Sequence, residues 1–220
     1  GFLGSGNIGS TVARLALAAG DQVVMSNSRG PDTLADLVAD LGEGARSATA
    51  AEAAAAGDIV VVTIPLKHYT AVPAAELAGK VVIDTMNYYP GRDGVIEPLQ
   101  SGASTSSELF QALVPTAAVV KGFNNIFFQH LAALARPDAG ERSALPISSD
   151  SPDAAATVTD LLDRIGYDAV LDGPLANSWR QQPETPVYGT PYAADPVDWT
   201  AGARTADAAE IAQRLGEARR

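Results

Sequence analysis

The sequence predicts an α/β fold in which a mostly parallel, doubly wound sheet is covered by helices on both faces. Strand and helix patterns alternate along most of the 220 residues, which is the order that builds parallel strands joined by crossover helices. Three continuous apolar runs, residues 58–64, 81–85 and 118–123, are typical of buried central strands. Each run ends in polar or glycine-containing sequence, so ligand-binding residues are expected at the carboxyl edge of the sheet.

A glycine-rich turn, Gly4–Gly9, separates a short apolar strand from a helical pattern. Its G-x-G-x-x-G spacing, in this strand-turn-helix setting, indicates a dinucleotide-binding, Rossmann-like fold. We expect Gly4 to allow the sharp turn, Gly6 to let a pyrophosphate approach the main chain, and Gly9 to let the helix pack closely on the strand. The first amides of the helix would then face the phosphates.

The end of the second predicted strand indicates which dinucleotide is bound. An NAD site usually has Asp or Glu there for the ribose hydroxyls, whereas this chain has Asn27, Ser28 and Arg29. A guanidinium and a hydroxyl can both hold an additional phosphate, so these residues favour NADP(H). The same residues would also suit a polar turn before a helix.

Further elements follow in an order that suits the same fold. Helices are expected at residues 31–41, 49–56 and 152–165, the last with Ser151 as its cap, and strands at 45–47, 144–148 and 169–171. Three strand ends should converge on the ligand side, because parallel strands share one carboxyl edge. These segments are residues 63–68, 84–87 and 121–125.

Composition excludes several classes of protein. The chain has no cysteine, so disulfides and cysteine metal sites are absent, and no His, Asp and Glu spacing suggests a metal site. No stretch approaches the roughly 20 apolar residues of a membrane span. A net charge of −11 argues against nucleic-acid binding. We expect a cytoplasmic protein. Because the sequence starts inside a strand without Met, we also expect a few residues before Gly1, and a short targeting segment there stays open.

Several motifs together resemble the F420-dependent NADP reductases and the related cytosolic domain of the six-transmembrane ferric reductases. Besides the glycine turn and Ser28-Arg29, they are Thr63–Pro65, Val119–Asn124 and Asp172–Ser178. The resemblance covers roughly residues 1–180 and implies hydride transfer between NADP(H) and a deazaflavin (F420) or flavin ring such as FMN or FAD. The chain departs from the family pattern in residues 124–128 and at its carboxyl end.

The resemblance also implies roles for individual residues. The implied cofactor-binding set is Gly4, Ser5, Gly6, Asn7, Ile8, Gly9, Asn27, Ser28, Arg29, Thr63, Ile64, Pro65 and Asn87. Within it, residues 5–8 would line the pyrophosphate turn, residues 28–29 would hold the 2′-phosphate, and residues 64–65 would lie beside the ribose and nicotinamide. The implied acceptor-binding set is Phe123, Asn124 and Asn125, which would form the floor together with Asn87, and Gly173, Pro174 and Leu175 on the opposite wall.

The last 40 residues differ from the rest of the chain. Residues 181–200 hold four prolines as well as Tyr188, Tyr192 and Trp199, and we expect an extended arm. Its aromatic side chains, with Trp179, could roof the ring pocket or pack at a subunit interface, and we expect the interface. A short helix is expected within residues 205–219. The predicted organisation is a single Rossmann-like domain: residues 1–180 bind NADP and the acceptor, and residues 181–220 form the arm of a homodimer.

Ring-to-ring hydride transfer needs orientation more than proton transfer, so no catalytic residue is required. His68 and Asn124 are weak catalytic candidates, whereas His130 is expected to be structural. We expect Lys121 to be a strand-end lysine with a solvated head rather than a reactive amine. Asp84 could bind substrate or cap loop amides.

Two alternatives to the ring acceptor remain open. One is a reductase of a small carbonyl or imine substrate. The other is a non-enzymatic NADP(H)-binding regulator in which Phe127 and Phe128 block the ring pocket.

Overall fold

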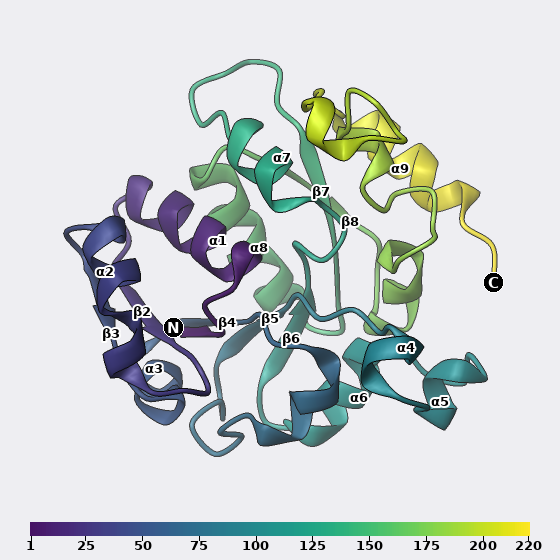
Figure 1. The fold of residues 1–220 in the computed structure, drawn as a ribbon. Helices are drawn as coiled ribbons and strands as arrows, with labels where there is room; N and C mark the ends of the chain where they lie inside the picture. The colour runs from purple at the N-terminus through teal and green to yellow at the C-terminus, as the bar shows by residue number, and fades with distance from the viewer.

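The computed structural model describes residues 1–220 and contains one eight-stranded sheet. The strands are β1 (Phe2–Leu3), β2 (Val23–Ser26), β3 (Ala45–Ser47), β4 (Ile59–Val62), β5 (Val81–Asp84), β6 (Ala118–Lys121), β7 (Ala144–Ser149) and β8 (Asp168–Leu171). Their order in the sheet is β3-β2-β1-β4-β5-β6-β7-β8 (Figure 1). Every neighbouring pair is parallel except β6 and β7. The Rossmann-like, mostly parallel, doubly wound fold is thus confirmed.

Helices cover both faces of the sheet. The α-helices are α1 (Asn7–Ala18), α2 (Ala35–Leu41), α3 (Ala50–Ala56), α4 (Pro90–Asp93), α5 (Glu97–Gln100), α6 (Ser106–Leu113), α7 (Phe128–Ala133), α8 (Pro152–Arg164) and α9 (Ala208–Glu217). Short stretches of 3-10 helix occupy Pro31–Leu34, Leu66–Ala71, Leu175–Gln181, Thr190–Tyr192 and Trp199–Ala201. No helix in the structure has both the length and the apolar character that crossing a membrane requires.

The central strands alternate between two hydrophobic clusters, one on each face of the sheet. Val61 belongs to the cluster that α1, α7, α8 and α9 cover, while Val60 and Val62 belong to the one under α3 and α6. Such continuous apolar strands are buried on both sides because side chains of successive residues point to opposite faces. The predicted central strands therefore form the middle of the sheet.

The region between β5 and β6 contains helices that the periodicity did not predict. Helix α6 starts with a capping box, in which Thr105 accepts from the Glu108 amide and the Glu108 carboxylate accepts from the Thr105 amide. The T-x-x-E spacing that builds this box was present in the sequence. The predicted cap of α8 is found as expected, since Ser151 Oγ accepts from the Ala154 amide.

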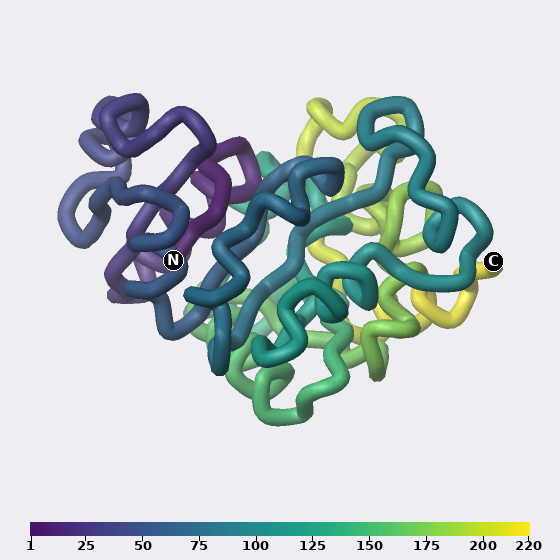
Figure 2. Tube along the Cα trace, turned by 90° about the horizontal axis from the view of Figure 1, so that it is seen from below, coloured from purple at the N-terminus to yellow at the C-terminus, as the bar shows by residue number.

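The segment after residue 180 is folded against the body, so the expectation of an extended arm is wrong. Tyr192 is fully buried, and its hydroxyl donates to the Ala144 carbonyl oxygen at 2.9 Å. Ile211 and Leu215 of α9 join the same hydrophobic cluster as α1 and α8. The prolines begin or flank short 3-10 turns here instead of keeping the chain extended. Figure 2 shows this yellow part of the chain at the end of the molecule opposite the purple amino-terminal segments.

Candidate active site

Two cavities adjoin at the carboxyl edge of the parallel strands. The glycine cavity, of about 520 Å³, is lined by residues 3–6, 26–29, 63–65 and part of the segment 68–73. The aromatic cavity, of about 450 Å³, extends from residues 6–8 to the loops after β5 and β6 and to Tyr188 and Trp199. Both cavities include Gly6, Thr63, Ile64 and Pro65. They therefore form one groove across the point where the strand order reverses, between β1 and β4.

The three glycines of the turn differ in the space around them. Gly4 has a φ of +117°, and a Cβ there would lie 2.5 Å from the Thr63 carbonyl oxygen. A Cβ on Gly9 would lie 2.5 Å from the Gly4 carbonyl oxygen and 2.7 Å from Thr63 Oγ1. At Gly6, the residue before α1, a Cβ would have no atom within 4 Å. Two glycines are thus needed by the chain itself, whereas Gly6 leaves open space that only a ligand would use.

The loop after β2 presents Ser28 and Arg29 to the glycine cavity. Asn27 fixes this loop, because its Oδ1 accepts from the Arg29 amide at 2.9 Å and its Nδ2 donates to Thr33 Oγ1 at 2.9 Å. Ser28 and Arg29 are exposed, and Arg29 takes part in none of the ion pairs of the chain. The guanidinium is therefore free to pair with an anion.

The structure places the predicted cofactor residues along this groove. All of them except Gly9, which is buried behind the turn, line one cavity or both. The glycine cavity also contains His68, which is exposed in the 3-10 turn after β4. His68 does not line the aromatic cavity, so it lies on the Ser28 side of the groove and not on the side expected for a catalytic acid.

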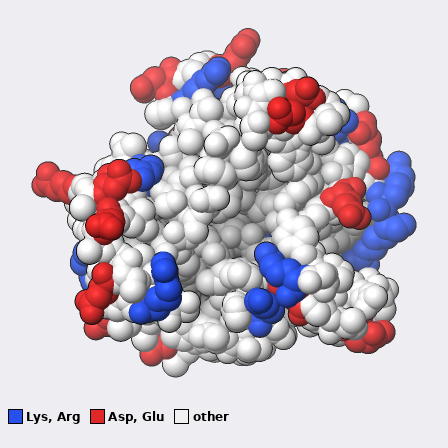
Figure 3. All heavy atoms as spheres, viewed as in Figure 1, with Lys and Arg blue, Asp and Glu red and all other residues white.

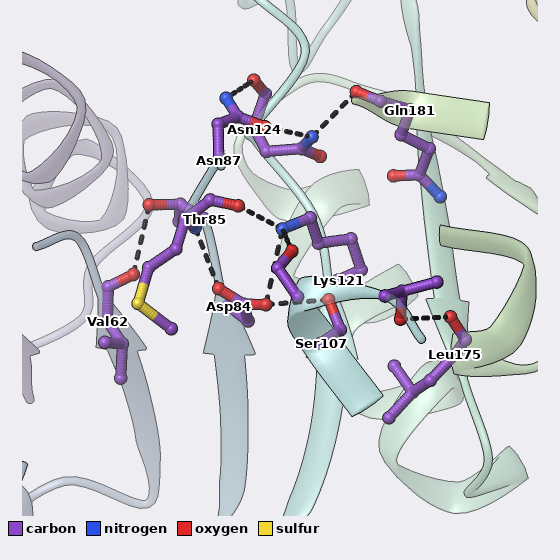
Figure 4. Close-up of polar contacts among 12 residues, drawn as sticks. Val62, Asp84, Thr85, Asn87, Ser107, Lys121, Asn124, Leu175 and Gln181 are labelled. Atoms are coloured by element: carbon purple, nitrogen blue, oxygen red, sulfur yellow. Dashed lines mark hydrogen bonds and ion pairs between the residues drawn. The ribbon is translucent and has the colours of Figure 1, made fainter. Parts of the chain in front are cut away.

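The floor of the aromatic cavity is formed by the loops that follow β5 and β6. Asn87 and Asn124 join these loops: Asn124 Nδ2 donates to Asn87 Oδ1 at 3.0 Å, and Asn87 Nδ2 donates to the Asn124 carbonyl oxygen at 2.8 Å. Asn124 Nδ2 also donates to the Gln181 carbonyl oxygen at 2.7 Å (Figure 4). Phe123 has a φ of +59°, a strained conformation that costs about 1–3 kcal/mol in a residue other than glycine. The floor is therefore tightly constrained.

Aromatic side chains form the wall of this cavity. Trp199 lies directly on Gly189, where a Cβ would be 2.0 Å from the indole ring. Its ring centroid is 6.0 Å from that of Tyr188 and 6.3 Å from that of Phe127. The Tyr188 hydroxyl is 2.6 Å from the hydroxyl of Tyr89, which also lines the cavity, and burial raises the pKa of Tyr188 above its usual range.

The aromatic cavity carries little net charge. Arg92 is its only charged lining residue, and Arg92 is paired with Asp93 at 2.8 Å and donates to the Asn87 carbonyl oxygen at 2.8 Å. Figure 3 shows a central hollow lined by uncharged atoms, with Lys and Arg side chains on its lower rim. Nowhere in the chain do three His, Asp or Glu side chains come together as metal ligands.

Several residues predicted on the acceptor side lie away from both cavities. Gly173, Pro174 and Leu175 line neither cavity. Leu175 is fully buried in the cluster under α6, where its carbonyl oxygen accepts from Thr105 Oγ1 at 3.1 Å. Asn125 is also buried away from the cavity, because its Nδ2 donates to the Val187 carbonyl oxygen and to the Tyr192 hydroxyl.

Lys121 is fully buried, which contradicts the expected solvated head. Its Nζ lies 3.3 Å from Asp84 Oδ2 and also donates to the Met86 carbonyl oxygen. Burial lowers the pKa of Lys121, an effect that Asp84 opposes. Asp84 Oδ1 accepts from the Met86 amide and so caps the loop, while Asp84 Oδ2 pairs with Lys121. Asp84 is therefore not a substrate ligand, and it does more than cap the loop.

The aromatic residues of the carboxyl-terminal segment were predicted at a subunit interface, but Tyr188 and Trp199 line the aromatic cavity and Tyr192 is in the core. His130 has the structural role that was expected, since its Nε2 is 2.8 Å from the Trp199 carbonyl oxygen. Tyr89 and Arg92 were missed as lining residues. Their only local signal was their position after β5, on the ligand side of the sheet.

Comparisons with known proteins agree with this geometry. A family model described as NADP oxidoreductase, coenzyme F420-dependent, matches residues 1–88. The crystal structure of hypothetical protein SMa0349 from Sinorhizobium meliloti covers 85% of this chain and 91% of its own, with 30% identity and a TM-score of 0.74. That of a candidate F420-dependent NADP reductase from Arthrobacter sp. FB24 covers 80% and 85%, with 24% identity and a TM-score of 0.68.

A shorter match is to the protein YjhV of Escherichia coli K12, which is 43% identical over 47 residues. This match spans 21% of the present chain and about a third, 34%, of that relative. Taken with the fold and with the groove at the carboxyl edge of the sheet, the family model and the S. meliloti structure establish the family. The chain belongs to the F420-dependent NADP oxidoreductases, a family of NADP-binding oxidoreductases with a Rossmann-like fold.

Proposed function

We propose that the protein binds NADP(H) along the glycine cavity and exchanges a hydride with a deazaflavin (F420) or flavin ring in the aromatic cavity. One observation carries the proposal: the two cavities meet at Gly6 and Thr63–Pro65. One end has groups that suit phosphates, and the other has an aromatic wall with little charge. A dinucleotide lying across this junction would have its nicotinamide beside the aromatic wall.

The nucleotide end fits the cofactor on two independent grounds. The open space at Gly6 faces the start of α1, which has no side-chain cap, so the first amides of the helix are available to a pyrophosphate. Ser28 and Arg29 are exposed on the preformed loop after β2. Because Arg29 has no carboxylate partner, it would pair with the 2′-phosphate that distinguishes NADP(H) from NAD(H).

The acceptor end favours a ring over a small carbonyl. When bound, NADPH supplies a hydride from its nicotinamide to the acceptor ring, and solvent supplies the proton that completes the reduction. The protein then has to orient two flat rings and exclude water. The aromatic cavity has no His, Asp, Glu or Lys in its lining, so a general acid for a carbonyl oxygen is limited to the two tyrosine hydroxyls.

The Tyr89 and Tyr188 hydroxyls give the alternative its only specific support. A tyrosine hydroxyl can donate a proton to a carbonyl or imine group, and this pair lies 2.6 Å apart at the cavity. The blocked-pocket regulator is less well supported, because Phe127 and Phe128 form part of the wall and leave a volume of about 450 Å³. The small-substrate reductase is therefore the second candidate.

Stopped-flow oxidation of NADPH with F420, FMN and FAD in parallel tests the proposal. A panel of small carbonyl and imine compounds, measured in the same way, tests the alternative. We expect turnover with at least one ring acceptor and a preference for NADPH over NADH. Turnover only with carbonyl or imine compounds would replace the proposal by the alternative. Tight NADPH binding without any turnover would favour the regulator. Light scattering in the same buffer tests the homodimer that the family resemblance implies.

A further inference from the structure

We propose that the buried Lys121–Asp84 pair is a positioning device that fixes the floor of the acceptor site by holding the single residue Met86 at both its amide and its carbonyl group. This inference rests on the proposed function. It goes beyond it by assigning a role in the reaction to two side chains that touch neither cavity.

The pair arises from the register of the sheet. Asp84 ends β5 and Lys121 ends β6, and the two residues are directly paired across these parallel strands. Both side chains are fully buried, with Nζ 3.3 Å from Oδ2. The pair thus lies immediately below the loop that leaves β5 for the aromatic cavity, as Figure 4 shows.

Of the four bonds that the pair makes with other residues, two end on that loop and two on Ser106 and Ser107 of α6. Asp84 Oδ1 accepts from the Met86 amide at 2.8 Å, and Lys121 Nζ donates to the Met86 carbonyl oxygen. Met86 stands between Thr85 and Asn87, and all three residues line the aromatic cavity. Thr85 Oγ1 is fixed in turn, since it donates to the Val62 carbonyl oxygen at 3.0 Å.

A requirement of the fold alone does not explain a charged pair at this position. Two buried charges lose their hydration, and an apolar pair of similar volume is often as stable or more stable. Here the charges are directed at the two main-chain polar groups of one residue, Met86, and Asp84 is supported from α6, where Ser107 Oγ donates to Asp84 Oδ2 at 2.7 Å. Specific polar orientation of a loop is what such an arrangement provides and an apolar pair does not.

Loss of the Lys121–Asp84 pair should slow catalysis and leave nucleotide binding intact. Hydride transfer depends on ring placement, and a displacement of about 1 Å caused by a distant mutation can cost about 100-fold in rate. The glycine cavity is built mainly on β1, β2 and the turn after β4. Loss of the pair should therefore lower kcat per NADPH-binding site while leaving the dissociation constant of NADPH almost unchanged.

The main test is the double variant Asp84→Asn with Lys121→Met, which removes both charges together so that no unpaired charge is left buried. The matched control is Asp40→Asn with Arg14→Met, which neutralises an exposed pair. We expect the double variant to lose about 10- to 100-fold in kcat, with the NADPH dissociation constant within about twofold of wild type. The control should change neither value.

A second readout does not depend on activity. Hydrogen exchange should show faster exchange of the Met86 amide in the double variant, with the amides of β1 and β2 unchanged. Unchanged kcat per binding site, or unchanged exchange at Met86, would overturn the proposal. If the double variant does not fold, Ser107→Ala, which removes one hydrogen bond to Asp84, replaces it. The same two quantities, kcat per binding site and exchange of the Met86 amide, are then measured. If the wild-type protein reduces no ring acceptor, the proposed function fails. The hydrogen-exchange result then decides by itself whether the pair holds Met86 in place.

Discussion

The two halves of the groove are built in different ways. The glycine cavity is lined by short segments within the first 73 residues: the glycine turn, the end of β2 with its loop, and the turn after β4. The aromatic cavity is formed by side chains from the loops after β5 and β6 and from Tyr188 and Trp199. The first half depends on the absence of side chains, and the second on the packing of large ones.

This difference affects how each half responds to mutation. A methyl group added to the glycine turn would either collide with the backbone or occupy the space of the ligand. Closely packed backbone cannot move far to make room for it. The aromatic wall consists of rings that contact one another, so removing one ring leaves the others in place. We therefore expect the largest effects in the glycine half, and smaller, acceptor-specific effects in the aromatic half.

The largest expected effects are those of Gly9→Ala and Gly6→Ala, which separate folding from binding. The Gly9 Cβ would lie 2.5 Å from the Gly4 carbonyl oxygen, so Gly9→Ala should destabilise the fold by about 1–3 kcal/mol and weaken NADPH binding. At Gly6 a Cβ meets no protein atom, so stability should change by less than about 1 kcal/mol. Thermal melts and NADPH titrations measure the two effects.

The two variants of the turn also act as controls for each other. The Gly6→Ala methyl group would occupy the pyrophosphate space, and NADPH affinity should fall at least about 10-fold. Normal NADPH affinity in Gly6→Ala would show that the pyrophosphate lies elsewhere, and the assignment of the glycine cavity would then fail.

The next effect is that of Arg29→Ala on cofactor choice. Loss of charge-assisted hydrogen bonds worth about 1.5–3 kcal/mol should weaken NADPH binding about 10- to 100-fold and leave NADH binding unchanged. Titration of both nucleotides by fluorescence measures this, with Arg14→Ala as control, because Arg14 pairs with Asp40 away from both cavities. Equal losses for the two nucleotides would contradict the contact with the 2′-phosphate.

A smaller effect, confined to the acceptor, is expected for Trp199→Leu. Stacking of an aromatic side chain on a planar ring is worth about 1–3 kcal/mol, so the KM for the acceptor should rise about fivefold or more while NADPH affinity is kept. Trp179→Leu is the matched control, because the Trp179 ring contacts Arg180 and Arg220 and lines neither cavity. An unchanged acceptor KM would mean that the ring binds elsewhere.

The sequence was sufficient for the fold class and for placing the glycine half of the groove at the strand ends, because both follow from local patterns. A strand, a turn and a helix are encoded within a few residues, and the sequence shows directly that no acidic residue stands at the end of β2, at positions 27–29. Trp199 could not be placed in this way, since its position depends on Gly189, on His130 and on the packing of Tyr192 in the core. Long-range contacts of this kind carry no periodic signal.

The surroundings of the charged residue Lys121 could not be predicted from local sequence either. A lysine at a strand end usually extends its head into water, and only the register of β5 with β6 reveals that Asp84 lies beside it. Conversely, Leu175 lies in a recognisable motif but is held in the body of the protein by contacts of its main chain with Thr105 and Asp150. A motif gives the position of a turn in the chain, whereas the tertiary contacts decide which surface that turn faces.

The smallest expected effect is that of His68→Asn. His68 is an exposed residue of the glycine cavity and is not part of the aromatic cavity, so kcat should change by less than about twofold, whereas loss of a general acid costs about 100- to 10,000-fold. The pH profile of kcat for wild type and variant measures the difference. A large loss, with one limb of the profile removed, would place proton transfer on the glycine side. In that event the nicotinamide would have to lie nearer Ser28 than Trp199, and the division of the groove into a nucleotide half and an acceptor half would be reversed.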